Sequence, residues 1–122
     1  MGDRANFGFK DRKGDTLYLY GHWAGHRMLE NLADAVQHAK PRWDDESYAT
    51  RISVSRLIND EWPSETGWGI TINELADNEH KVPVIDWSNK TFTLMEEDLT
   101  TVVFSTTLDA FVSKYSSQPS MV

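Results

Sequence analysis

The sequence predicts an α+β domain, a mostly antiparallel sheet with two to three helices packed on it. Short stretches that alternate apolar and polar residues indicate strands, and longer stretches with apolar residues every three or four positions indicate helices. No stretch rich in Pro, Gly or Ser divides the 122 residues. We therefore expect a single globular domain over residues 1–115 and a frayed C-terminal tail over 116–122.

The chain opens with a pattern that predicts a β-hairpin. Residues 5–10 and 16–20 both alternate, so that Phe7 and Phe9 share one face of the first strand. The polar loop between them contains Gly14, where a positive φ costs little.

Two helices are expected next. From Arg27 to about residue 39 the apolar period is helical, and Pro41 ends it because the residue before a proline avoids the helical region. Asp44 and Asp45 offer an N-cap for a second helix over roughly residues 46–58.

The second half of the chain predicts strands followed by a last helix. Residues 68–72 alternate, and 82–87 with 91–95 read as a second hairpin. Residues 99–105 are ambiguous, although their β-branched residues favour a strand. Residues 106–115 are helical in period, with Ser105 as a possible cap. The predicted order is ββααβββ(β)α.

Composition excludes several classes of function. The chain has no cysteine, which excludes disulfides, thiolate metal sites and a cysteine nucleophile. The net charge of −7 disfavours bulk nucleic-acid binding. No apolar run approaches the roughly 20 residues that a membrane helix needs, so we expect no membrane contact. Residues 1–56 carry nine Lys/Arg and eight Asp/Glu, whereas 57–122 carry three and eleven, so an anion site is expected in the first half.

The stretch from Tyr20 to Arg27 is the most unusual in the sequence. Two glycines flank His22 and Trp23 at a junction between a strand and a helix. The Tyr20 and Trp23 rings suit stacking on a flat ligand, and Arg27 suits a two-pronged contact with phosphate or carboxylate. In the alternative interpretation, Trp23 only closes the end of the sheet and the glycines only let the chain turn.

Further candidate ligand-binding residues lie along the chain at Arg42, Trp43, Arg51 and Trp68. Arg51, like Arg56, stands inside an apolar helical pattern. Trp43 has an alternative role as a staple that packs onto the second helix. The alternative for Trp68, which lies between two glycines, is a bulge or bend. The binding hypothesis requires these residues to converge on a single cleft.

No pattern predicts catalysis, a metal or a cofactor. His22 and His26 lack the third and fourth ligands that a zinc site needs, and no serine stands in a nucleophile-elbow context. We therefore expect a non-enzymatic protein. A small hydrolase that uses His22 remains a third alternative.

Six short motifs occur in order over about residues 1–95. They are MGDR (Met1–Arg4), YLYGHWAG (Tyr18–Gly25), RWDD (Arg42–Asp45), YATRI (Tyr48–Ile52), ETGWGI (Glu65–Ile70) and DNE (Asp77–Glu79). This series resembles a family of small proteins encoded by tailed bacteriophages. The resemblance implies a phage origin and action in the host cytoplasm, on host enzymes, polymerase or immunity, rather than a particular activity.

Two main functions follow as expectations. The first is sequestration of a small anionic, nucleotide-derived ligand by a homo-oligomer. A weaker resemblance to phage sponge proteins that bind immune signals also favours this function. That resemblance rests on chain length, the α+β class and the content of aromatic residues and arginine. The second is a protein–protein effector that inhibits or redirects a host protein, because the acidic second half suits a basic partner.

Overall fold

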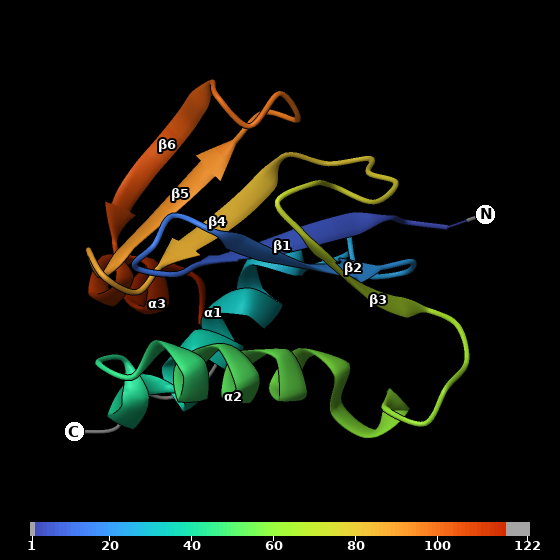
Figure 1. Cartoon of the computed structure of the whole chain (residues 1–122), viewed down its shortest axis with the longest axis horizontal. Coiled ribbons are helices and arrows are strands. Elements are labelled where there is room, and N and C mark those ends of the chain that lie inside the picture. Colours follow the sequence, from blue (N-terminus) through green and yellow to red (C-terminus); the bar gives the residue numbers. More distant parts are fainter. Residues whose placement is uncertain (1, 117–122) are drawn as a thin grey trace.

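The structure, a computed structural model that describes residues 2–116, contains a six-stranded sheet with three helices on one face (Figure 1). The strands are β1 (Ala5–Lys10), β2 (Thr16–Gly21), β3 (Trp68–Ile72), β4 (Val82–Asp86), β5 (Thr91–Met95) and β6 (Val102–Thr107). The helices are α1 (Met28–His38), α2 (Glu46–Ile58) and α3 (Leu108–Tyr115), with short 3-10 turns at Lys40–Arg42 and Asn59–Glu61. The predicted α+β class and element order are confirmed.

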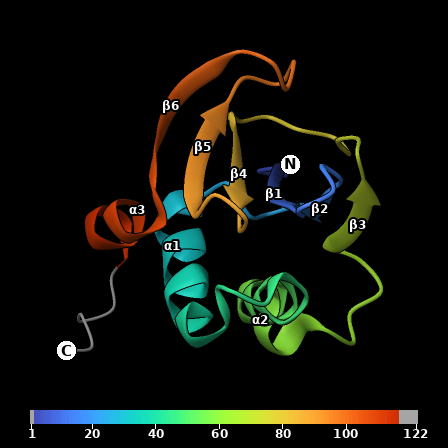
Figure 2. The same ribbon diagram turned by 60° about the vertical axis from the view of Figure 1, so that its left-hand side comes forward.

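The strands lie in the order β3-β2-β1-β4-β5-β6. All neighbours are antiparallel except β1 and β4, which are parallel, with Gly8 opposite Val84. The sheet is therefore two antiparallel three-stranded halves joined along β1 and β4. Figure 2 shows α3, α1 and α2 side by side under these strands, with β3 beyond α2 at the margin of the helical layer.

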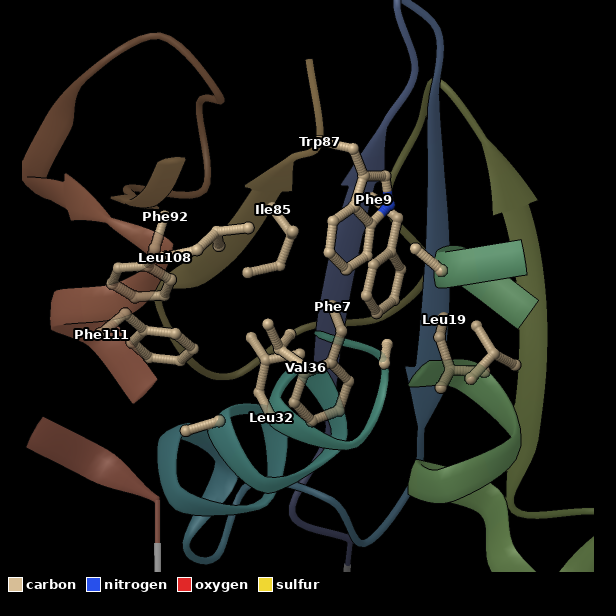
Figure 3. Packing of buried hydrophobic residues seen from close by; sticks show 14 of the residues in the cluster. Phe7, Phe9, Leu19, Leu32, Val36, Ile85, Trp87, Phe92, Leu108 and Phe111 are labelled. Carbon is tan, nitrogen blue, oxygen red and sulfur yellow. The ribbon is translucent and has the colours of Figure 1, made fainter. Parts of the chain in front are cut away.

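The main core lies between the sheet and the helices (Figure 3). Phe7 and Phe9 project into it from β1, as the alternation predicts. The buried rings of Phe92 and Phe111 stack with centroids 3.9 Å apart, which fastens α3 to β5. Trp87 stacks on Phe9 in the same layer, at 6.3 Å.

The opposite face of the sheet is covered by the connection between β3 and β4. Asn6 is fully buried there, and its amide nitrogen donates to the Asp77 carbonyl at 3.0 Å and to Asn78 Oδ1 at 3.2 Å. The Ala76 N–H in turn donates to Asn6 Oδ1 at 3.3 Å. This buried amide therefore helps to hold the connection on the sheet, together with backbone bonds from Asn73 to Thr16 and from Glu79 to Arg4. A second small apolar cluster that includes Tyr18 lies under the same connection.

Two helix starts differ from the sequence prediction. The first helix begins at Met28 because Arg27, its cap residue, has a φ of 57° and lies in the left-handed region. The last begins at Leu108, since the strand runs to Thr107, whose hydroxyl accepts from the Ala110 N–H at 3.1 Å. Thr107 is the cap, and Ser105 is not.

The predicted frayed tail is only partly within the described chain. The Ser116 hydroxyl lies 2.7 Å from Asp34 Oδ1 and 2.6 Å from Gln37 Oε1, so this residue is held against α1. Residues 117–122 lie outside the described residues.

Candidate functional site

A hollow of about 300 Å³ opens where α1 faces the C-terminal part of α2. The turn before α1 and the start of β3 complete its wall. Besides apolar residues, it is lined by the polar and aromatic residues Trp23, His26, Asn31, Asp34, Arg56, Asn59 and Trp68. The site therefore lies at the corner between strand and helix that the sequence singles out.

Trp23 is held at the mouth of this hollow by its neighbours. Its ring is 63% exposed and meets the His22 imidazole edge-on, with centroids 4.6 Å apart. His22 Nδ1 is in turn hydrogen-bonded to the Tyr20 hydroxyl at 2.8 Å. A Cβ at Gly67, where φ is 98°, would lie 3.2 Å from the Trp23 ring, so this position suits glycine. Trp23 is thus an oriented, solvent-accessible ring, and it does not plug the sheet.

The second tryptophan of the hollow, Trp68, is half-buried. Its indole N–H donates to Glu61 Oε1 at 2.8 Å, which fixes the ring in the wall. The ring also leaves little room at Gly21, where a Cβ would lie 2.9 Å from it. The glycine before the turn therefore permits close packing of strand, turn and tryptophan.

Positive charge reaches the hollow from α2. A second hollow of about 420 Å³ shares Arg56 and Asn59 with the first and is also lined by His38, Arg51 and Ser55. Within residues 2–116, neither Arg51 nor Arg56 forms an ion pair. Both guanidinium groups are exposed, so their five N–H donors each stay available to an anion.

Not all predicted site residues share this cleft. Trp23 and Trp68 line the first hollow, and Arg51 lines the adjoining one. Tyr20 and His22 do not line either hollow; His22 contacts the Trp23 ring, and Tyr20 bonds to His22. The structure therefore brings only Trp23 and Trp68 together in one hollow, with Arg51 next to it, and places the other three residues elsewhere.

The remaining three predicted residues lie elsewhere. Arg27 lines a different hollow of about 550 Å³ and faces Glu30 at 3.9 Å. The Arg42 guanidinium lies 5.4 Å from the Tyr48 ring centroid, outside the hollows described here. Trp43 is buried in the core, and its indole donates to the Val36 carbonyl at 2.9 Å. Packing in the core therefore explains Trp43, and its indole bonds back to α1 rather than forward to the second helix that the staple interpretation names.

The structure adds Arg56, His26 and Asn59 to the site. Arg56 carries a sequence signal, because a cation inside an apolar helical pattern is unusual. The sequence does not predict that Arg56 lies near Trp23, because the packing of α1 against α2 brings the two residues together. His22 bonds to a hydroxyl rather than a carboxylate, so the hydrolase alternative gains no acid partner.

The comparisons with known proteins identify no relative: the chain matches no family model, no curated protein and no solved structure. Within residues 2–116, no group of three or more His, Asp or Glu side chains is placed to hold a metal ion. None of the described helices is both long and apolar enough to cross a membrane.

Proposed function

We propose that the protein binds a small anionic ligand that carries a flat ring, such as a nucleotide derivative, in the hollow between α1 and α2. One observation carries the proposal: Trp23, exposed and oriented, lines the same hollow as the Arg56 guanidinium, which forms no ion pair within residues 2–116. The ring offers a stacking surface, and the guanidinium offers paired donors to phosphate or carboxylate oxygens.

Stacking on Trp23 and hydrogen bonding to Arg56 can each contribute substantially to the free energy of binding. Stacking of one base on an aromatic side chain contributes about 1–3 kcal/mol, and a hydrogen bond to a charged group about 1.5–3 kcal/mol before other costs. Asn31 and Asn59 add amide donors and acceptors for a base edge. The volume of about 300 Å³ lies at the lower end of the range of small-molecule sites, and the adjoining hollow extends it toward Arg51.

In this proposal the protein acts by sequestration rather than catalysis. The motif series supports a phage-encoded protein that works in the cytoplasm of an infected host. Removal of a nucleotide-derived signal is what the weaker resemblance to phage sponge proteins implies. A homo-oligomer would present several such sites. The net charge of −7 opposes long-range attraction of an anion, so affinity depends on the local arginines.

Calorimetric titration with cyclic dinucleotides, cyclic ADP-ribose isomers and NAD fragments tests the proposal. Trp23→Ala should weaken binding about 5- to 150-fold, which corresponds to the loss of one stack. Arg56→Ala should weaken it further for phosphorylated members of the panel.

Arg42→Ala is the matched control, because this exposed arginine contacts Tyr48 outside the hollow. Native mass spectrometry of the purified protein reports a retained ligand and the subunit count together. No binding across the panel and no retained small molecule, or equal binding by the Trp23 and Arg42 variants, would reject the proposed function.

A further inference from the structure

A groove of about 480 Å³ lies on the helix side of the sheet between α2 and β3, at a different place from the ligand hollow. β3 is one of the two edge strands of the sheet, and Figure 2 shows that it lies beyond α2, the helix at that end of the layer. The apolar residues that line the groove are Phe9, Leu17, Val54, Trp62, Ile70 and Ile72. The helical layer thus stops one strand short of the sheet.

Three of these side chains are left open to solvent. Trp62, Ile70 and Ile72 are 53%, 51% and 57% exposed, whereas Phe9 and Val54 behind them are buried. Ile70 and Ile72 pair with Leu19 and Leu17 of β2, so they stand on the same face as the core residue Leu19. A contiguous exposed apolar surface next to a core marks a contact site rather than random exposure.

The charge at one end of the groove is acidic. Asp11, Asp15 and Glu46 line it, and within the described chain none of the three forms an ion pair. Among the described residues, their carboxylates accept hydrogen bonds only from backbone N–H groups and from the Asn73 amide. Of the described residues that line the groove, Arg51 alone carries a positive charge. The surface therefore complements a partner that carries positive charge beside its apolar residues.

We propose that this groove binds a basic amphipathic helix of another protein. Its apolar face would cover Trp62, Ile70 and Ile72, and its Lys or Arg residues would meet the acidic end. A helix fits because α1, α2 and α3 already pack on this face, and a further helix beside α2 would continue the layer over β3. The exposed isoleucines project from the face of β3, whereas an added strand would pair with its edge.

A labelled peptide tests the groove directly. The probe is a fluorescein-labelled helix of about 18 residues made of Leu and Lys at helical spacing, measured by fluorescence anisotropy against the full chain. Ile72→Asp and Trp62→Ala should each weaken its binding at least about tenfold, because each removes apolar contact. Glu46→Gln keeps the side chain's shape, removes its charge and should weaken binding at low salt.

Val103→Asp is the matched control, since Val103 is an exposed apolar residue of β6 at the opposite edge of the sheet. Near-ultraviolet circular dichroism confirms that each variant is folded. Equal binding by the wild type, the Ile72 variant and the Trp62 variant overturns the proposal. The proposal is also overturned if a helix of Leu and Glu binds as tightly as the Leu/Lys helix. It is overturned as well if a Leu/Lys peptide with the alternating pattern of a strand binds more tightly than the helix. Sedimentation that shows a dimer, converted to monomer by Ile72→Asp, would assign the groove to a second copy instead.

Discussion

Replacement of Asn6 should loosen the connection between β3 and β4 and destabilise the fold. Asn6 is fully buried and makes three hydrogen bonds of 3.0–3.3 Å to residues 76–78. A typical hydrogen bond contributes a net of about 1 kcal/mol. Asn6→Ala removes these three and a longer, weaker one of 3.5 Å to the Ala76 carbonyl, so we expect a loss of about 2–3 kcal/mol in unfolding free energy. For a domain of this size the loss lowers Tm by roughly 10 °C.

Thermal and urea unfolding followed by circular dichroism measures this loss, and amide hydrogen exchange locates it. Exchange should accelerate first in the connection over residues 73–81, because its peptide groups become hydrated when the anchor is gone. Asn89→Ala is the control, since this exposed asparagine contacts only Asp86 in a turn. Stabilities of the Asn6 and Asn89 variants that agree within about 0.5 kcal/mol would refute the anchoring role of Asn6.

Three further predictions follow from the core and from two titrating groups. Phe111→Ala removes a fully buried ring stacked on Phe92 and should cost about 3–5 kcal/mol in urea unfolding; Val103→Ala at the exposed edge should cost far less. Hydrogen bonds from the following turn lower the pKa of Asp98 to about 2, so its stabilisation is present above about pH 4 and disappears as pH falls toward 2. The stability gap between wild type and Asp98→Asn should therefore close over that range in acid unfolding curves. Burial raises the pKa of Tyr18 above its usual 10, so folding holds the neutral phenol and stability falls as pH rises past 10. In an alkaline absorbance titration, Tyr18→Phe should remove a late-titrating component.

Most of the fold could be predicted because each element carries a local signal. The second helix and the strands at 68–72 and 91–95 have the predicted bounds, since apolar period and flanking polar turns agree there. The sequence predicts that the last helix begins at residue 106, two residues before its observed start at Leu108. The reason is that residues 102–107 contain β-branched residues and threonines, which continue a strand as readily as they cap a helix. The parallel pairing of β1 with β4 has no local signal.

The sequence predicts only part of the candidate site. Tyr20, His22 and Trp23 lie within four residues and stay together in space because they belong to one strand end and turn. Arg56 reaches the same hollow only through the packing of α1 on α2, which no spacing reveals. Trp43 is predicted as a ligand-binding residue because it stands at the end of an element, but its side chain packs into the core and its indole N–H donates to the Val36 carbonyl.

The parallel seam between β1 and β4 has a consequence for biosynthesis. Strand β1 is made first, but the partner that covers its second edge is about seventy-five residues later in the chain. During translation at about 5–20 residues per second, the hairpin and α1 can form while that edge stays open for several seconds. Until the last third of the chain leaves the ribosome, the unpaired edge of β1 is therefore open to chaperones or to other nascent chains. A stop codon before β4 would make that temporary exposure permanent.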